Sequence, residues 1–362
     1  MDLHDRQQRI LAELRMHGTV SVADFAQRIG VSPMTVRRDL RELADAGRVR
    51  RIHGGAEAVE AEAFGGVRHR PAPRAGGDAS GADAPLFTLG LITPDPSYYF
   101  PQIVDGAVER TRALGGRVVL GVSLYEAERE RAQIARMLSG GADALLVTTT
   151  VADSFDRFAQ LSEAPVPVVM VERSVENAPV GDELESVRTD HSAGAVIGIR
   201  HLAELGHERI GMYFVETPSA PFLRVGVRRA LERLDLPPVS PVAEVPEGDS
   251  GDLARSFLRS ALDAGVTAVL AHSDHYAVEL TGIALEMGLD VPGDLSILTF
   301  DDSFAALAAV PLTAVTPPGR DIGRLAAAMA FERLASTDTV SAARHVTLRP
   351  RLTVRESTGP RR

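Results

Sequence analysis

The chain has 362 residues, the length of about two to three domains. It contains no cysteine, and all 39 residues counted as Lys or Arg are arginine. Disulfides, thiolate metal sites, cysteine nucleophiles, Schiff-base lysines and Walker-type phosphate loops are therefore excluded. The net charge of −10 is segregated, because residues 1–53 hold 10 Arg against 7 Asp and Glu and the remainder holds 29 against 42. We expect the small basic part to meet nucleic acid and the acidic bulk to be repelled by it.

The sequence contains neither the apolar core of a signal peptide nor a run of 18 apolar residues. These features predict a cytoplasmic protein that does not span a membrane.

Periodic apolar residues predict three helices near the N-terminus. The first covers residues 3–16 and ends at Gly18, and the second, of about two turns, starts at Ser21 and ends at Gly30. The third begins at Ser32, whose hydroxyl can cap it. The second and third helices, joined by a short turn, form a helix-turn-helix.

The third helix has two different faces. Val36, Leu40 and Leu43 recur at helical spacing and predict its buried stripe. The opposite face carries Met34, Arg38 and Arg41, flanked by Thr35 and Arg37. Hydroxyl and guanidinium groups bind phosphates and guanine edges, so this face is suited to a DNA groove.

A basic hairpin follows the helices. Beyond Gly47, arginines and apolar residues alternate as far as Gly54–Gly55, which is a two-residue hairpin signal. This alternation predicts a wing that pairs with the chain around Val20. An alternative is a solvated helical domain whose arginines only keep it soluble, but a capped helix, an arginine face and a basic hairpin in this order favour DNA binding. The predicted DNA-contacting residues are Ser32, Met34, Thr35, Arg37, Arg38, Arg41, Arg50, Arg51 and His53.

Residues Ser32 to Leu40 and Arg51 to Ala56 resemble the DeoR-type winged helix-turn-helix, whose pattern is Ser, two residues, Thr-Val-Arg-Arg-Asp-Leu and then Arg, an apolar residue, His-Gly-Gly-Ala. The resemblance implies a DNA-binding domain over residues 1–57. Residues 58–85 then form a predicted flexible linker, since from Gly65 to Pro85 large apolar side chains are almost absent.

From Leu86 onward, short apolar runs alternate with helical patterns. Two successive series of this kind predict two parallel sheets covered by helices, a doubly wound α/β fold with two subdomains and a ligand cleft at the carboxyl ends of the strands. The predicted strands are Leu86–Ile92, Arg117–Val122, Ala144–Thr148, Val166–Val171, Arg209–Val215, Ala243–Val245, Thr267–Ala271 and Leu295–Phe300. The predicted helices lie near 101–114, 126–139, 153–162, 191–205, 221–234, 251–264 and 275–287.

Most of residues 86–357 resembles the effector domain of the LacI/GalR family, which is related to periplasmic sugar-binding proteins. The motifs that carry the resemblance are Leu202–Ile210, Ser273–Ala277, Val291–Asp302, Pro311–Val315 and Leu348–Ser357. The resemblance implies two subdomains joined by three crossings, near Thr189, Pro317 and Ala342. The family's hinge helix is absent, because the Gly65 to Pro85 segment cannot form it. The chain is thus similar to a hybrid, a DeoR-type reader joined to a LacI-type sensor.

The aromatic run Tyr98, Tyr99 and Phe100 follows the first strand of this part. The resemblance implies that residues at this place line the cleft, where the rings could stack on a sugar. The alternative is that they pack the start of the next helix.

Three carboxylates stand at strand ends. The resemblance places Glu172 and Asp301 on ligand hydroxyls, with Ser273 or Asp274 beside them, and such acceptors suit a neutral polyol. Helix capping is the alternative, above all for Asp274.

Arg224 is a further candidate, on a different ground. The family's ligand-clamping Arg lies three residues before a Gly, whereas Gly226 has Leu223 at that distance and Arg224 at two. Either the loop shifts by one residue or the clamp is lost. The predicted effector-binding residues are Tyr98, Tyr99, Phe100, Glu172, Arg224, Ser273, Asp274 and Asp301.

Two apparent enzyme signals carry little weight. The GDSG sequence at residues 248–251 is similar to a protease nucleophile loop, but the matching His motif and disulfides of that all-β fold are missing. His272, Asp274 and His275 diverge around a helix start, so they do not predict a metal site.

We therefore expect a DNA-binding transcription regulator, a repressor released by a small carbohydrate, that acts as a homodimer without a cofactor or a bound metal. One alternative is an enzyme with a DNA-binding head, such as a sugar kinase or phosphosugar isomerase. Another is a ligand-independent DNA-binding dimer.

Overall fold

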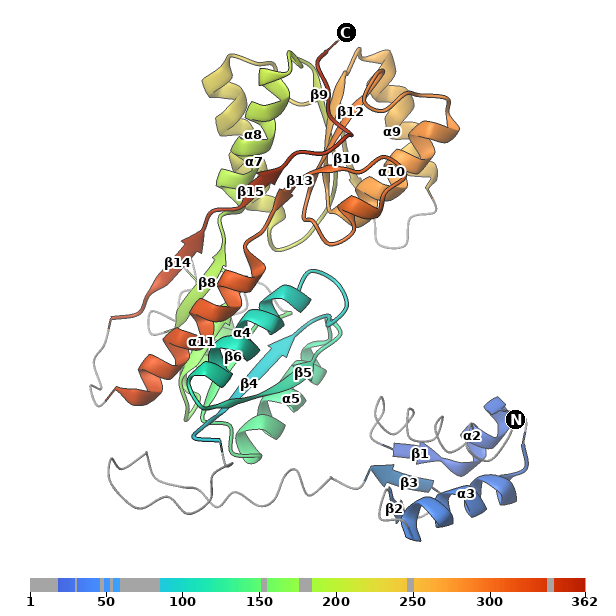
Figure 1. Cartoon of the computed structure of the whole chain (residues 1–362), viewed down its shortest axis with the longest axis vertical. Helices are drawn as coiled ribbons and strands as arrows, with labels where there is room; N and C mark the ends of the chain where they lie inside the picture. Colours follow the sequence, from blue (N-terminus) through green and yellow to red (C-terminus); the bar gives the residue numbers. More distant parts are fainter. Residues whose placement is uncertain are drawn as a thin grey trace. The chain divides into compact units, whose positions relative to one another are not determined.

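A computed structural model describes residues 19–29, 31–45, 49–52, 55–58, 85–150, 155–175, 184–245, 251–336 and 342–361 (Figure 1). The chain divides into two compact units, residues 1–72 and residues 73–362, and each is described by itself. The helix expected over residues 3–16 and most of the linker expected over residues 58–85 lie outside the described residues.

The described residues of the first unit form two helices and a three-stranded antiparallel sheet. The helices are α2 (Val22–Ile29) and α3 (Pro33–Asp45), and the sheet has the order β1 (Thr19–Ser21), β3 (Gly55–Ala58), β2 (Val49–Ile52). Val20 lies opposite Ala56, so the predicted pairing of this segment with the wing is confirmed. The Ser32 hydroxyl accepts a hydrogen bond from the backbone N–H of Thr35 at 3.1 Å, which caps α3 as expected.

The second unit contains two doubly wound subdomains, as expected from the alternation of strands and helices. The first subdomain has a six-stranded parallel sheet, with the order β14-β8-β7-β6-β4-β5. Its strands are β4 (Thr88–Thr93), β5 (Arg117–Val122), β6 (Ala144–Val147), β7 (Val168–Val171), β8 (Glu185–Thr189) and β14 (His345–Leu348). Helices α4 (Pro101–Ala113) and α11 (Gly319–Ala335) cover one face, and α5 (Ala127–Ser139) and α6 (Phe155–Ser162) the other.

The second subdomain has the sheet order β10-β9-β11-β12-β13-β15, in which only the β13–β15 pair is antiparallel. Its strands are β9 (Ile210–Val215), β10 (Val242–Val245), β11 (Ala268–His272), β12 (Ser296–Phe300), β13 (Thr313–Thr316) and β15 (Arg351–Thr353). Helices α7 (His191–Glu204) and α8 (Ala220–Leu234) pack on one face, and α9 (Asp252–Asp263) and α10 (Asp274–Glu286) on the other.

The chain crosses between the subdomains three times. The first crossing follows Thr189, at the end of β8, and the second passes through residues 317–318, between β13 and α11. The third was expected near Ala342, but this position is wrong. Residues His345–Leu348 form β14, which pairs with β8 in the first subdomain, so the chain cannot cross until residues 349–350.

Among the described residues of this unit, four β-strands and one α-helix are absent from the sequence prediction: β8, β13, β14, β15 and α11. The helix α11 has a structural role that its weak periodicity hides. It lies against α4 (Figure 1), and the contact is so close that a Cβ at Gly323 would stand 2.0 Å from the Ile103 carbonyl oxygen. Glycine is required at position 323 because the backbones of α11 and α4 approach each other too closely for a side chain. This contact packs α11 onto α4.

Candidate effector cleft and DNA-binding face

The first unit presents one face of α3 to solvent. Met34 is 69% exposed, and Ser32, Arg37, Arg38 and Arg41 are also exposed, with Thr35 half-buried. The opposite stripe of α3 packs with α2 in a core that contains Phe25, Val36, Leu40 and Leu43. The structure places Arg50 and Arg51 on β2, whereas His53 lies outside the described residues. An exposed helix face bearing three guanidinium groups, next to an arginine-bearing strand, has the composition that DNA grooves and phosphates bind.

The second unit contains a cavity of about 630 Å³ whose lining comes from both subdomains. Of the predicted effector-binding residues, six line it, and they come from loops after β4, β7, β11 and β12. They are Tyr98, Tyr99, Phe100, Glu172, Ser273 and Asp301. The cleft therefore lies at the carboxyl ends of parallel strands, as is usual for open α/β sheets.

Glu172 is held by hydrogen bonds from the first subdomain. Its Oε1 accepts from the Tyr99 hydroxyl and from the Thr189 hydroxyl, each at 2.8 Å, and its Oε2 accepts from the Thr189 backbone N–H at 3.1 Å. The Nε2 of His191 lies 3.5 Å from Oε2. Burial acts to raise the pKa of Glu172, but the His191 and Thr189 contacts outweigh burial and lower it. Glu172 is thus a charged acceptor in the cleft wall.

The pKa of Asp301 is shifted in the opposite direction to that of Glu172. It is 5% exposed and takes a left-handed backbone conformation (φ 72°) directly after β12. Burial and the nearby carboxylate of Asp274 raise its pKa well above the usual range, against a hydrogen bond from the Tyr98 hydroxyl at 3.3 Å. A buried carboxyl with one long hydrogen bond retains acceptor capacity for a ligand.

Asp274 has a structural role instead. Its Oδ1 accepts from the Tyr98 hydroxyl at 2.6 Å, and its Oδ2 accepts from the backbone N–H groups of Phe304 and, at 3.1 Å, Ala305. It is not among the residues that line the cavity. Its carboxylate instead fixes the loop after β12 and holds Tyr98 across the cleft, so the cavity lining gives no support to the effector contact predicted for Asp274.

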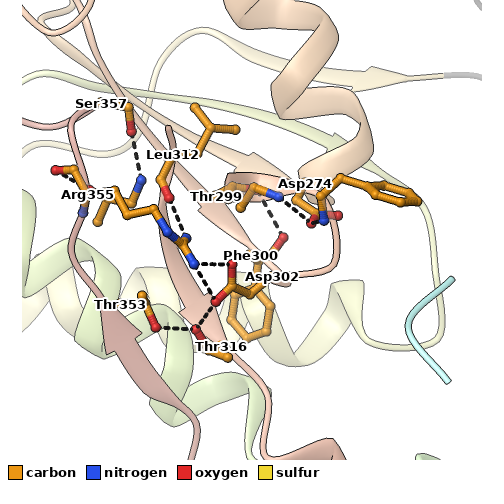
Figure 2. A network of polar contacts seen from close by, with 12 residues as sticks. Asp274, Thr299, Phe300, Asp302, Leu312, Thr316, Thr353, Arg355 and Ser357 are labelled. Atoms are coloured by element: carbon orange, nitrogen blue, oxygen red, sulfur yellow. Dashed lines mark hydrogen bonds and ion pairs between the residues drawn. The ribbon is translucent and has the colours of Figure 1, made fainter. Parts of the chain in front are cut away.

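The neighbouring Asp302 forms polar contacts that hold the loop after β12 in place. Its carboxylate forms an ion pair with Arg355 at 2.8 Å and accepts from the Thr316 hydroxyl at 2.8 Å, and Thr316 in turn lies 2.6 Å from the Thr353 hydroxyl (Figure 2). This network joins the loop after β12 to the ends of β13 and β15. The network holds the loop that carries Asp301 close to the crossings at residues 317–318 and 349–350.

Arg224 does not line the cavity, so the structure gives no support to the effector contact predicted for it. Its guanidinium pairs with Glu216 and lies 3.7 Å from Glu244, and it packs over the Phe214 ring. The reason is the packing of α8 on α7, since a Cβ at Gly226 would lie 2.2 Å from the Ser192 carbonyl oxygen. This contact fixes the register of α8, which buries Leu223 to 1% exposure and turns Arg224 away from the cleft.

Several residues that line the cavity were not predicted. Arg173 follows Glu172 and donates to the carbonyls of Thr149, at 2.7 Å, and Glu172, at 2.8 Å. Arg188 lies with its guanidinium carbon 4.7 Å from the centre of the Phe222 ring, and so joins β8 to α8. His191 and His272 also line the cavity. Recognition of β8 in the sequence would have found Arg188 and His191, because both stand at the carboxyl end of that strand.

A winged helix-turn-helix followed by a two-subdomain ligand cleft defines the class of a ligand-binding DNA regulator. Comparisons with known proteins agree with this class. A model of the DeoR-like helix-turn-helix domain matches residues 6–62, and a model of the periplasmic binding protein-like domain matches residues 199–358. The chain belongs to the LacI family of transcriptional regulators, with a DeoR-like domain at its N-terminus.

Three similar proteins illustrate the relationship. The arabinose metabolism transcriptional repressor of Geobacillus stearothermophilus is 29% identical over 350 residues, which cover 92% of this chain and 90% of that protein. The transcriptional repressor CytR of Escherichia coli is 30% identical over 256 residues, covering 68% and 72%. The crystal structure of a LacI family regulator from Enterococcus faecium with bound ribose has a TM-score of 0.63 at 23% identity, covering 76% and 100%.

These three proteins are transcription regulators, and none is named as a kinase or isomerase. The hybrid expected from the sequence is therefore confirmed, as is a DNA-binding regulator as its function. Among the described residues, no helix has both the length and the apolar character needed to cross a lipid bilayer.

Proposed function

We propose that this regulator is a homodimeric repressor and that a neutral monosaccharide, bound in the cleft, lowers its affinity for DNA. The observation that carries the proposal is the composition of the cavity wall. Charged Glu172, buried Asp301 and the rings of Tyr98 and Tyr99 line one cavity of about 630 Å³. Carboxylates accept hydrogen bonds from sugar hydroxyls, and aromatic rings cover the apolar face of a sugar.

The relatives support a pentose as the first ligand to test. Two are named arabinose metabolism repressors, at 29% and 26% identity over more than nine-tenths of this chain. Structures of the same fold hold ribose in one case and D-xylulofuranose in another.

The charges of the cleft favour an uncharged sugar over a phosphorylated one. The guanidinium of Arg173 is already directed to two backbone carbonyls, and Arg188 lies over Phe222. A phosphate would instead approach the carboxylates of Glu172 and Glu216, which would repel it.

The proposed homodimer follows from the size of the DNA-binding part. The helix α3 has 13 residues, and its described exposed residues lie between Met34 and Arg41, so one copy reads few base pairs. Two copies related by a two-fold axis would read two half-sites of an operator. The proposed DNA contacts are the nine residues predicted on α3 and the wing.

Thermal unfolding of the full chain with a panel of L-arabinose, D-ribose, D-xylose and their phosphorylated forms tests the effector. A sugar at 100 times its Kd stabilises the folded state by about 2.7 kcal/mol, so binding is readily seen. We expect at least one neutral pentose to raise the Tm and to weaken operator binding. If phosphorylated sugars alone bind, the assignment of a neutral effector is wrong.

Asp301→Ala tests whether the response to the sugar depends on the cleft. We expect it to bind the operator as tightly as the unchanged protein and to lose the response to the sugar, since it removes an acceptor from the cleft and leaves the first unit intact. An unchanged response at wild-type sugar concentrations would remove Asp301 from the site.

A further inference from the structure

Tyr98 and Tyr99 are adjacent in the loop between β4 and α4, yet their hydroxyl groups bind different subdomains. The Tyr99 hydroxyl donates to Oε1 of Glu172 at 2.8 Å, within the first subdomain. The Tyr98 hydroxyl donates instead to Oδ1 of Asp274 at 2.6 Å, and Asp274 is the first residue of α10 in the second subdomain. Tyr98 therefore joins the two walls of the cleft.

The ring of Tyr98 is held by the second subdomain as well. It stacks on Phe304, with the ring centres 5.5 Å apart and an angle of 30° between the planes. The hydroxyl also lies 3.3 Å from Oδ2 of Asp301. A tyrosine hydroxyl has a single hydrogen, so the shorter bond, to Asp274, is the principal one. Because Tyr98 lines the cavity, these contacts fix one part of the cavity wall.

The carboxylate of Asp274 is a fixed acceptor for this bond. Its side chain is fully buried, and its second oxygen accepts from the backbone N–H groups of Phe304 and Ala305. These bonds hold the carboxylate in place whether or not a ligand is present. Hydrogen bonds to a carboxylate are about twice as strong as those between neutral groups, so the bond from Tyr98 is a substantial link.

The bond between Tyr98 and Asp274 depends on how the two subdomains are placed. The two residues are 176 positions apart in the chain, and neither belongs to one of the three crossings. A rotation of one subdomain about the crossings would move the residues apart, and a hydrogen bond weakens steeply as its donor and acceptor separate. The bond therefore favours the arrangement of the cleft that is seen in this structure.

We propose that Asp274 is a positioning residue of the effector site, which acts through the Tyr98 hydroxyl to hold the cleft in its ligand-binding arrangement before the sugar arrives. This inference rests on the proposed function, since it takes the cleft to be the effector site. The apparent Kd of a ligand is its intrinsic Kd divided by the fraction of the protein that is competent to bind. The bond raises this fraction without contacting any group of the sugar, so its loss weakens every sugar by the same factor.

Two substitutions break the bond from its two ends. Tyr98→Phe removes the hydroxyl and keeps the ring that stacks on Phe304. Asp274→Asn replaces the carboxylate by a neutral amide of nearly the same shape, which cannot accept from all three donors. Tyr276→Phe is the matched control, because it makes the same change on α10 at a residue that does not line the cavity.

The measurement is calorimetric titration of the full chain with L-arabinose, D-ribose and D-xylose, followed by the monodeoxy analogues of the tightest-binding sugar. We expect Tyr98→Phe and Asp274→Asn each to raise the Kd about tenfold, by a common factor for every sugar and analogue that binds. The double variant should lie within about threefold of either single variant, since both remove the same bond. Tyr276→Phe should keep the Kd of the unchanged protein.

The same titrations separate positioning from a loss of folded protein. A substitution that only unfolds part of the sample lowers the binding stoichiometry and leaves the Kd of the folded remainder unchanged. That result, or an unchanged or lower Kd in Tyr98→Phe, would overturn the inference while the proposed function stands. If Asp274→Asn does not fold, the uniform loss in Tyr98→Phe decides alone.

Two further patterns count against the inference. One is a loss in Tyr98→Phe for the parent sugar but not for one deoxy analogue, which would show that the hydroxyl contacts the sugar directly. The other is a double variant weakened by the product of the two single factors, which would show that the two residues act independently. If none of the sugars binds the unchanged protein, the proposed function fails and this inference fails with it.

Discussion

Asp301, a proposed effector contact, carries a buried carboxyl group that is costly to ionise in the folded protein. Its pKa is raised well above the usual range by burial and by the Asp274 carboxylate. The folded state therefore keeps a proton on Asp301 at pH values where the unfolded chain has released it. The protonated carboxyl therefore favours the folded state. This contribution to the free energy of unfolding is fully present below the ordinary Asp pKa of about 3.9 and is lost as the pH rises through the raised pKa.

Asp301→Asn replaces the carboxyl group with a neutral amide of nearly the same shape. The substitution therefore removes the free-energy cost of ionising a buried carboxyl group at high pH. Asn also tolerates the left-handed backbone found at this position (φ 72°). We expect the variant to unfold at a higher temperature than the unchanged protein without sugar, by about 1 kcal/mol or 2–4 °C at pH 8. The difference should shrink toward pH 4, where both side chains are neutral. Calorimetric scans at several pH values measure it, and a difference that does not vary with pH would contradict the assignment.

Arg38 is the residue of α3 with which the DNA-binding face is best tested. It is exposed beside Arg37 and Arg41 on the face opposite the buried stripe. We expect Arg38→Ala to weaken operator binding by about 1–3 kcal/mol and to relax sequence preference where it contacts a base edge. Gel-shift titrations against the operator and a shuffled sequence distinguish the two effects. Arg259→Ala, an exposed arginine of α9, serves as the control and should change neither.

Among the helices, two glycines should affect the stability of the protein in opposite directions when each is changed to alanine. A Cβ at Gly323 of α11 would lie 2.0 Å from the Ile103 carbonyl oxygen, whereas a Cβ at Gly282 of α10 would meet nothing within 4 Å. Gly323→Ala should force α11 away from α4 and cost about 1–3 kcal/mol. Gly282→Ala should raise stability by about 0.5–1 kcal/mol, because alanine is the better helix former. Chemical denaturation of both variants tests the pair, and equal effects would argue against the close helix contact.

For the whole molecule, a flexible linker, which the sequence predicts over residues 58–85, would limit how the cleft can act on DNA. A flexible segment cannot transmit force as a rigid element, so we expect cleft closure to change the dimer and thereby the simultaneous engagement of two DNA-binding units. Residues 1–72 alone should bind a half-site weakly and ignore every sugar. The full chain should bind the operator about 10² to 10⁴ times more tightly and respond to its sugar. Fluorescence anisotropy measures both, and a monomeric full chain in sedimentation would contradict this mechanism.

Local patterns in the sequence were sufficient for the DNA-binding unit and for the general fold. The cap at Ser32, the stripe of Val36 and Leu40 and the exposed arginines all act within a few residues, so neighbours in the sequence determine them. The continuous apolar strands, buried on both faces, likewise indicated two parallel sheets. Glu172 and Asp301 follow the ends of these strands and line the cavity, and the family resemblance had proposed both as effector contacts.

Only the tertiary structure decided the composition of the cleft, because that depends on contacts between distant residues. The strand β8 reads as polar in sequence, and it is a strand because β7 and β14 pair with its two edges. Gly226 contacts the Ser192 backbone, and this packing turns Arg224 outward. Sequence patterns reveal which face of an element is buried, but the partner of each buried polar atom is set by chain segments that meet only on folding.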